Sequence, residues 1–550
     1  MSLKAQAICP VPGETARVAR AAYPKGNLYM QMRDVLGSIY TDEDFTALFP
    51  KEGQPTEAPW RLALVTVMQF VENLSDRQAA DAVRGRIDWK YLLGLELTDT
   101  GFDASVLSEF RARLINQHAE ELLLEKMLTL FQKKGWLKAR GRQRTDSTHV
   151  LAKIRALNRV LCVWETMRAA LDSLAVVAPD WLRAHSQVEW VERYGPRSED
   201  SRSPLGEEAR VAFAEEIGEQ GRELLDALFD PTAPEWFHLV PAVEILRKVW
   251  VQNYQRVDDG VRWRSSEDIP PASRYIGSPY DEEAHYSKKR STTWVGYKVH
   301  LTESCEAHLP LLITHVETTS APVSDDARTA AIHAGLDRKG LLPAEHIVDT
   351  GYVDAKLLVE SQRDYQIDLV GPTRKNYRWQ ATQQTGFDAS HFPIDWNQQQ
   401  ATCPEGHTSI SWTPAIDNRK NEVIKIKFST TDCQVCPSRS QCTQSIRHTR
   451  RTVTIRPQEQ YQALKERREQ EKTREFTQVY AKRAGIEGTI SQGVRTMGMR
   501  RSRYIGQEKT HLQHIATGAA LNMVRCMAWF SGLPRAQTRR SAFTRLYDAI

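Results

Sequence analysis

The sequence predicts a mixed α/β protein, and three patterns carry that prediction. Residues 292–304 and 309–320 are two strand-like runs separated by a short turn, as in antiparallel neighbours. Residues 344–372 follow the order strand, turn, helix and strand, which is typical of an α/β crossover unit. On either side, residues 30–135 and 152–260 carry apolar residues at helical spacing.

The N-terminal part, residues 1–135, is predicted to be a helical domain. Residues 58–74 form an apolar helical pattern, and Ser75 with Gln78 three residues later has the layout of a capping box. Asp103 or Ser105 begins a further helix. Short helices joined by tight turns are compatible with a helix-turn-helix DNA-binding motif or with a plain helical bundle, and the sequence leaves both open.

A predicted strand at residues 144–154 is followed by a long helical segment. Thr145, Thr148 and Val150 favour a strand and surround one acid, Asp146. Residues 152–271 then return to helical patterns. A polar, acidic stretch lies between the helical runs, and residues 181–240 carry a net charge of −7.

In the last third of the chain, the composition and the predicted secondary structure change twice. Residues 375–455 are polar, Gln-rich and β-leaning. We expect residues 457–483 to form one long charged helix that continues through residues 480–495, followed by a more apolar helix over residues 510–530. The tail, residues 531–550, is short and basic.

Charge is unevenly distributed along the chain. The net charge is +5, yet residues 441–550 carry +13. A strongly basic last fifth is typical of phosphate binding and favours contact with nucleic acid, with a solvated charged helix as the alternative. No uncharged apolar run reaches membrane-spanning length and the start lacks a signal-peptide layout, so we expect a soluble intracellular protein with no membrane partner.

Three carboxylates stand out by their placement. Asp146 lies on an isolated predicted strand, Asp349 at the C-terminal end of another, and Glu487 on a late helix within a basic segment. Such groups, brought together, raise one another's pKa values, and divalent cations relieve that repulsion. Mg²⁺ prefers oxygen ligands, and two ions about 4 Å apart activate an attacking oxygen and stabilise a leaving one at a phosphodiester. The triad therefore indicates nuclease or strand-transfer chemistry.

Spacing alone does not single out this triad. Asp354 and Asp368 are competing acids, and any of these residues could be a cap or turn residue. Asp325 and Asp326 are more simply first-turn residues favoured by the helix dipole.

The order of the predicted elements and three short motifs resemble a known family. The motifs are TDSTHV around Asp146, VDTGY around Asp349, and Tyr-x-x-Arg-x-x-x-Glu at Tyr480, Arg483 and Glu487. Over residues 30–530 this combination is similar to the DDE transposases of bacterial insertion sequences, in the group that carries the Tyr-x-x-Arg-x-x-x-Glu signature.

The resemblance implies a fold and a domain organisation. It predicts an RNase H-like mixed sheet core built from three separate parts, residues 136–151, 272–374 and 456–530. A helical insertion, residues 152–271, and a β-rich insertion with a cysteine cluster, residues 375–455, interrupt this core. The N-terminal helical domain, residues 1–135, would bind DNA, and residues 531–550 would form a basic tail.

The resemblance also implies roles for individual residues. Asp146, Asp349 and Glu487 would be the metal-binding catalytic acids, and Tyr480 and Arg483 would position DNA phosphates beside them. On a continuous helix, Tyr480 lies within about 20° of Glu487 and Arg483 within about 40°. We therefore expect one helix face to carry all three.

One position departs from the family pattern. The family usually has a Lys seven positions after the Glu, where this chain has Val494 followed by Arg495. Arg495 lies roughly 80° further around the helix, so its long side chain is a candidate substitute, and a plain surface residue is the alternative.

Further basic residues are candidates for phosphate contacts because they lie beside the predicted core strands or just after the Glu helix. These candidates are Arg500, Arg501, Arg503, Lys509, Lys288, Lys289 and Arg290, with additional charge at residues 449–457 and 535–540. Trp294 and Tyr297 are expected either to pack in the core or to stack on an unpaired or flipped base. We place Trp294 among the candidate DNA-binding residues.

Four of the eight cysteines cluster in the β-rich segment. Cys433 and Cys436 have CxxC spacing, and Cys403 and Cys442 flank them. This pattern predicts a structural Zn²⁺ site with the four cysteines as ligands and His407 in reserve. Free reduced thiols are the alternative.

Together with the resemblance, these features predict a Mg²⁺-dependent DDE transposase, with two Mg²⁺ ions and Mn²⁺ as an alternative ion. It would bind the terminal inverted repeats of its element, hydrolyse one strand, and join the 3′-hydroxyl ends to target DNA. Double-stranded DNA is the expected partner, and we expect a homodimer on DNA because two ends must be paired, in the bacterial cytoplasm and associated with the nucleoid. A domesticated, non-transposing DNA-binding protein and a stand-alone RNase H-like nuclease remain open.

Overall fold

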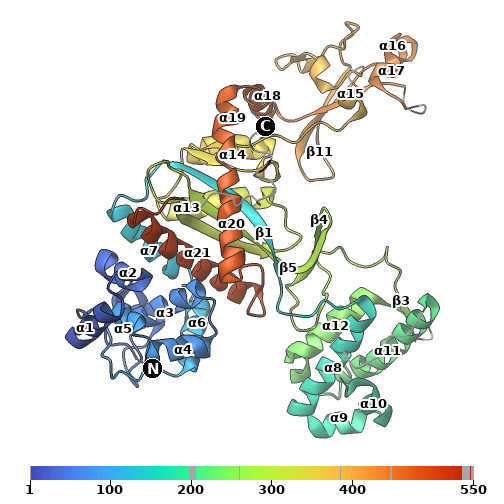
Figure 1. The fold of residues 1–550 in the computed structure, drawn as a ribbon. Helices are drawn as coiled ribbons and strands as arrows, with labels where there is room; N and C mark the ends of the chain where they lie inside the picture. The colour runs from blue at the N-terminus through green and yellow to red at the C-terminus, as the bar shows by residue number, and fades with distance from the viewer. Residues whose placement is uncertain are drawn as a thin grey trace.

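The computed structural model describes residues 2–5, 7–196, 206–258, 260–383, 386–445, 447, 449–535 and 546. A mixed sheet lies at the centre with helices around it, which confirms the predicted α/β class (Figure 1). A helical group, labelled α8 to α12 in the figure, and a β-rich group around β11 extend away from this centre. Of the predicted basic tail, all positions after residue 535 except 546 lie outside the described residues.

The central sheet has six strands within the described chain. β1 (Arg142–Leu151) pairs antiparallel with β5 (Thr292–Ser304) and parallel with β7 (Glu345–Ile347), which pairs parallel with β8 (Asp368–Val370). The other edge of β5 pairs antiparallel with β4 (His285–Lys289) near its start and with β6 (Ile313–Ser320) along the rest. The predicted antiparallel pair, now β5 and β6, is confirmed. The predicted strand-turn-helix-strand unit is also confirmed, with η3 (Thr350–Tyr352) and α14 (Ala355–Tyr365) between β7 and β8.

Different helices cover the two faces of the sheet, because side chains of a strand alternate between its faces. On one face, Thr145 Oγ1 lies 2.6 Å from His346 Nε2, and His346 Nδ1 lies 2.8 Å from Nε2 of His333 in α13 (Asp326–Arg338). On the other face, the neighbouring Arg144 pairs with Glu303, which also binds Arg525 of α21 (Gln507–Phe530). α13 and α21 therefore lie on opposite faces.

The N-terminal helices pack onto this centre rather than standing apart from it. Most of their buried residues belong to the same continuous core as those of β5, β6 and α21, while Ala19, Met30 and Tyr91 form a small cluster of their own. Ser75 and Gln78 form the predicted capping box, and Asp103, rather than Ser105, is the N-cap of its helix. The elements are α1 (Gly13–Ala22), α2 (Leu28–Leu36), η1 (Asp42–Leu48), α3 (Pro59–Val71), α4 (Asp76–Gly85), α5 (Ile87–Leu93), α6 (Ala104–Asn116) and α7 (Leu122–Lys133).

The segment after β1 is a helical group with a core of its own. Its buried residues, including Trp164, Leu224 and Trp250, form a cluster separate from the main core. The elements are α8 (Arg159–Val177), α9 (Pro179–His185), α10 (Val188–Tyr194), α11 (Glu207–Leu228), η2 (Glu235–Leu239), α12 (Pro241–Asn253), β2 (Tyr254–Val257) and β3 (Gly260–Trp263).

A second separate core lies in the β-rich group before α18. It is built around Phe392, Ile426, Phe428 and Val453. The elements are α15 (Trp379–Thr382), η4 (Ala389–His391), β9 (Ile394–Asp395), β10 (Gln400–Ala401), β11 (Ser411–Ile416), β12 (Glu422–Lys427), α16 (Thr430–Val435), α17 (Arg439–Cys442) and β13 (Thr452–Ile455).

The single long helix predicted over residues 457–495 is wrong. The structure has α18 (Gln458–Gln470), α19 (Arg474–Ala481) and α20 (Ala484–Met497) instead. Thr473 caps α19 through its side chain, which ends the continuity after α18. At Lys482 and Arg483 the backbone tightens into i→i−3 hydrogen bonds, with Arg483 N donating to Tyr480 O at 2.9 Å.

In the described part of the chain, the structure has no helix that is both long and apolar enough to cross a membrane.

Trp250 provides a test of whether the α8–α12 group is a separate folding unit. Its indole is 4% exposed, donates from Nε1 to Gly218 O at 2.9 Å, and packs so closely on Gly221 that a Cβ there would collide with it. Trp250→Ala should cost about 3 to 5 kcal/mol of local stability. Hydrogen exchange should then rise in α8, α11 and α12 while β1 and β5 keep their protection.

Val251→Ala on the same helix is the matched control, because that side chain is 63% exposed. Equal loss of protection in β1 and β5 of the Trp250 variant would contradict separate folding of the group.

Candidate active site

The strand register brings Asp146 and Asp349 to the same level of the sheet. Arg144 of β1 pairs with Ile347 of β7 in parallel register. Continuing that register by two residues sets Asp349 beside Asp146, on strands about 5 Å apart. Two carboxylates separated by 203 positions in the sequence therefore become neighbours.

The loop after β7 is shaped to keep these carboxylates close. Asp349 is the N-cap of η3, and its Oδ1 accepts a hydrogen bond from Gly351 N at 2.7 Å. A Cβ on Gly351 would lie 2.8 Å from Asp349 Oδ1 and 3.1 Å from Asp325 Oδ2. The absence of a side chain at Gly351 thus leaves room for the carboxylates of Asp349 and Asp325.

Arg483 connects Asp146 to Glu487. Its Nη1 lies 2.9 Å from Asp146 Oδ2, and its Nη2 lies 2.7 Å from Glu487 Oε1. Asp146 and Arg483 are largely buried, with 14% and 18% of their side chains exposed, whereas Glu487 is 61% exposed. One guanidinium thereby bridges the strand acid and the helix acid, which is the arrangement expected of Arg483 and Glu487 on one face.

Tyr480 reaches the same place from a different helix. It lies in α19, with its ring stacked on Phe476 at a centroid distance of 5.8 Å. Burial raises the pKa of Tyr480, while nearby Arg483 opposes this shift and Asp349 adds to it. Tyr480 is therefore within electrostatic reach of Arg483 and Asp349, although no continuous helix carries it.

Burial dominates the electrostatics of Asp146. Burial raises the pKa of its carboxyl, the Arg483 guanidinium opposes that shift together with a hydrogen bond from Ser147 N, and the charge of Asp349 raises the pKa further. Lys298 and Ser147 turn toward Asp325, with Lys298 Nζ and Ser147 Oγ each 3.3 Å from Asp325 Oδ1. The sequence suggested only a first-turn role for Asp325, and nothing in its spacing pointed to this position beside the acids.

The donor set of Asp146, Asp349 and Glu487 suits a hard divalent cation, because it consists of carboxylate oxygens alone. Among the described residues, no group of three or more His, Cys, Asp or Glu side chains converges closely enough to hold a metal ion. At this site the physical reason is the Arg483 guanidinium, which occupies the space between Asp146 and Glu487. Metal binding by all three acids requires that Arg483 release at least one of them.

The candidate phosphate-binding residues fall into two groups. Most are exposed, including Arg495 in the last turn of α20, Arg501, Lys509, and Lys288 with its neighbours in and after β4. Arg495 lies about 12 Å along the helix from Glu487, at 1.5 Å per residue. Arg500 is exposed but also donates from Nε to Thr148 Oγ1 at 2.9 Å.

Two candidates point into the protein. Arg503 donates to Leu74 O at 2.6 Å and to Asn73 Oδ1, and its guanidinium lies 4.5 Å from the Phe70 ring centroid. It therefore fastens the segment after α20 to the N-terminal helices. Trp294 is 5% exposed, so no base can stack on it, and the core alternative applies.

A basic cleft beside the acids was not predicted. Its volume is about 770 Å³, and Ser324, Asp326 and Val353 bring one wall next to Asp325 and Gly351. Four arginines line the other parts, from the segment after β8, the β11–β12 turn, the segment before α18, and α18 itself. They are Arg374, Arg419, Arg456 and Arg468, of which Arg374 pairs with Asp326 and Arg456 with Asp354 of the same cleft. Arg456 belongs to the basic run 449–457, whereas Arg374, Arg419 and Arg468 lie in polar stretches without a motif, and only the fold reveals that the four share a cleft.

The four clustered cysteines surround one small cavity of about 30 Å³, together with His407 and Asp432. Cys403 starts a tight turn in which its N–H donates to His407 O at 2.8 Å and Gly406 N donates to Cys403 O at 2.9 Å. Burial raises the pKa of Cys442 to about 11, Arg451 opposes this, and the other three thiols add to it. The cysteines are thus neighbours, although their described positions do not form a metal-binding group.

Two family models match parts of the chain. Residues 402–527 match a transposase DDE domain, and residues 17–113 match a transposase domain designated DUF772. The first match covers Glu487 and the cysteines but not Asp146 or Asp349, so the placement of those two acids rests on the geometry above. No curated protein matches the chain at a significant level.

The raised pKa of Asp146 gives a pH-dependent stability prediction. A carboxyl whose pKa is raised by folding favours the folded state most below its ordinary pKa near about 4, and that contribution is lost as the pH rises through the folded value. Asp146→Asn cannot ionise. Its melting temperature should therefore exceed that of the parent protein at pH 7.5, and the difference should shrink as the pH falls toward 4.5.

Circular dichroism melts of both proteins across this range provide the measurement. Asp364→Asn, at a fully exposed acid whose pKa Arg363 lowers, should show no such gain. A lower melting temperature for Asp146→Asn at pH 7.5 would show that the pairing with Arg483 outweighs the cost of burial.

Proposed function

Since its two family matches indicate an insertion-sequence DDE transposase, we propose that the chain binds the ends of its own element, hydrolyses a phosphodiester there, and joins the freed 3′-hydroxyl to target DNA. The observation that carries this proposal is the Arg483 guanidinium that bridges Asp146 and Glu487, with Asp349 next to Asp146 by the continued register of β1 and β7. Carboxylates from two parallel strands and one helix, beside a basic cleft, suit phosphoryl transfer on a polyanion.

The sheet supports an RNase H-like core as the catalytic scaffold. Its order is β4-β5-β1-β7-β8, with β6 also paired to β5; β6, β5 and β1 are antiparallel, and β1, β7 and β8 are parallel. Two insertions interrupt the core and have separate hydrophobic clusters, which supports their assignment as added modules.

Asp146, Asp349 and Glu487 would hold divalent cations, for which the family match to a DDE domain gives general support. We propose Mg²⁺, two ions, with Mn²⁺ as an alternative. When bound, such ions activate an attacking oxygen and stabilise the leaving oxygen at the phosphodiester. The chain's own contribution is to hold the acids at one level of the sheet and to keep Asp146 shielded from bulk water.

Arg483 and Tyr480 would act on the DNA backbone. The Arg483 guanidinium bridges two carboxylates, and a planar guanidinium binds phosphate in the same forked geometry. A phosphate at the site therefore offers Arg483 a new partner as it releases the acids. The exposed Arg501 and Lys509, together with the cleft arginines, would bind phosphates further along the DNA.

The N-terminal helices would recognise the element ends, because residues 17–113 match a transposase domain. A homodimer on double-stranded DNA follows from the need to pair two ends. A domesticated DNA-binding protein would bind ends without cutting them, and a stand-alone nuclease would cut without joining. Products of the reaction distinguish these alternatives.

The triad gives the first functional prediction. Asp146→Asn, Asp349→Asn and Glu487→Gln should each reduce cleavage and strand transfer of labelled element-end DNA in Mg²⁺ at least about 100-fold, because each removes a charge that counts for several kcal/mol of transition-state stabilisation. DNA binding in a gel-shift assay should persist in all three variants.

Asp364→Asn, at an exposed acid of α14, is the control and should keep parental rates. Full activity in Glu487→Gln would remove Glu487 from the proposed site. Cleavage without joined products would favour the nuclease, and binding without either product would favour the domesticated protein.

We also propose that Cys403, Cys433, Cys436 and Cys442 bind one structural Zn²⁺. Their common cavity and the tight turn at Cys403 support this, because thiolates in such a turn suit tetrahedral zinc. The high pKa of the Cys442 thiol would fall on metal binding, since only the thiolate is a ligand.

Metal analysis tests the zinc proposal. The purified protein should contain about one zinc per chain, and Cys436→Ser should lose most of it and lower the melting temperature. Cys9→Ser, at an exposed cysteine far from the cluster in sequence, should retain the zinc. A parent protein without zinc would favour the free-thiol alternative.

A further inference from the structure

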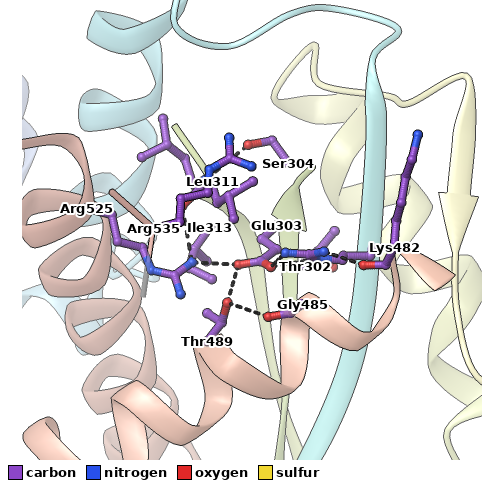
Figure 2. A network of polar contacts seen from close by, with 12 residues as sticks. Thr302, Glu303, Ser304, Leu311, Ile313, Lys482, Gly485, Thr489, Arg525 and Arg535 are labelled. Atoms are coloured by element: carbon purple, nitrogen blue, oxygen red, sulfur yellow. Dashed lines mark hydrogen bonds and ion pairs between the residues drawn. The ribbon is translucent and has the colours of Figure 1, made fainter. Parts of the chain in front are cut away.

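A buried ion-pair network lies directly beneath the first turn of α20. At its centre, the Glu303 side chain of β5 is fully buried. Glu303 Oε1 accepts from Arg144 Nε at 2.7 Å, and Oε2 accepts from Thr489 Oγ1 at 2.5 Å and from Arg525 Nη1 at 2.8 Å. Figure 2 shows Glu303 between Arg525 and Thr489. One carboxylate thus joins β5, β1, α20 and α21.

A buried ion-pair network of this kind contributes little net stability to the fold by itself. Removing two charges from water is costly, and well-packed apolar side chains of similar volume often stabilise a core as well or better. Hydrogen-bonded charges instead fix the relative orientation of the groups that they join, because each donor must meet a particular oxygen at a particular angle. A network that spans four elements therefore fixes how those elements lie against one another.

The network continues as a ladder along the face of β1 that carries Asp146. Arg144, Asp146 and Thr148 share that face because they alternate along the strand. Arg144 donates from Nη1 to Lys482 O, Asp146 pairs with Arg483, and Thr148 accepts from Arg500. Contacts before, at and after the proposed catalytic acid therefore set the position of α20 along β1.

Gly485 makes the closest contact of this ladder possible. A Cβ at Gly485 would collide with the guanidinium of Arg144. Gly485 O also lies 3.5 Å from Thr489 Oγ1, as Figure 2 shows. A side chain at position 485 would therefore displace the Arg144 guanidinium from its present position.

The position of Glu487 depends on this docking. Its side chain is 61% exposed, and its ion pair is with Arg483, which belongs to the same turn. A displacement of that turn moves both residues relative to Asp146. Displacements of about 1 Å at a reacting centre are enough to cost about 100-fold in rate.

We propose that Glu303, with Arg144 and Thr489, is a positioning residue that holds Glu487 and Arg483 opposite Asp146. It touches neither DNA nor metal, and acts through the register of α20 on β1. The proposal rests on the proposed function, since it assumes that these acids hold the divalent cation.

A pair of substitutions at Thr489 tests it with little change in shape. Thr489→Val removes the hydrogen bond to Glu303, and Thr489→Ser retains the hydroxyl. Thr489→Val should weaken Mn²⁺ binding, measured by electron paramagnetic resonance of free Mn²⁺, and lower the cleavage rate, each by about 10- to 100-fold. Thr489→Ser should stay within about threefold of the parent, and affinity for element-end DNA should be the same in all three proteins.

Thr496→Val is the matched control on the same helix, because its exposed hydroxyl donates to Gln492 O of that helix at 2.8 Å. It should bind Mn²⁺ and cleave DNA as the parent does. Gly485→Ala is a second variant, which should reproduce the Mn²⁺ defect of Thr489→Val by displacing the Arg144 guanidinium.

The outcomes distinguish a failure of the proposed function from a failure of the proposed positioning role. A parent protein that neither binds Mn²⁺ at this site nor cleaves DNA would overturn the proposed function. A parent that does both, with Thr489→Val and Gly485→Ala matching it in Mn²⁺ affinity and rate, would overturn the positioning role alone. Equal defects in Thr489→Val and Thr489→Ser would also overturn it, because the hydroxyl would then not be the group that matters.

Discussion

Repulsion between carboxylates is the constraint that the rest of this structure has to satisfy. Asp349 follows the end of β7 at the level of Asp146 on the neighbouring strand β1, and its charge raises the pKa of Asp146. Glu487 is added from α20. Such a cluster is stable only with a positive charge among the acids, and Arg483 supplies it through one guanidinium. Arg483 thus holds Asp146 and Glu487 together, and the proposed divalent cation would take over this role.

Three sets of contacts, at increasing distance from the acids, hold this arrangement in place. The parallel pairing of β1 with β7 sets the separation of the two strand acids. The Glu303 network sets where α20 lies on β1. Further out, α21 joins the sheet to the N-terminal helices in one continuous core, and Arg503 fastens the segment after α20 to Asn73 and Leu74. The helices proposed to recognise DNA are thereby rigidly connected to the proposed chemistry.

Local signals in the sequence were sufficient for much of the fold. Strand patterns around Asp146 and Asp349, the β5–β6 pair, and the capping box at Ser75 all depend on residues within a few positions of one another. The long helix after residue 457 was predicted wrongly because that prediction also relied on local propensity alone. Charged residues with high helix propensity continue across Lys482, and propensity does not record that Arg144, distant in sequence, binds the Lys482 carbonyl.

What the sequence could not provide were contacts over long separations. Arg144 and Glu303 are 159 positions apart, and Glu303 and Arg525 are 222 apart. Arg503 looks in the sequence like its exposed neighbour Arg501, and only the packing of the N-terminal helices shows that it points inward. Trp294 was open to two interpretations until its burial decided for the core.

Iron-directed backbone cleavage tests the central claim, that three distant carboxylates form one cation site. Fe²⁺ would replace the divalent cation, and ascorbate with peroxide then generates radicals that cut the chain near the bound ion. The account predicts cuts near residues 146, 349 and 487 in the same protein, all suppressed by excess Mg²⁺ and all lost in Asp349→Asn. Cuts at only one of these positions, or a pattern unchanged by Mg²⁺ and by Asp349→Asn, would contradict it.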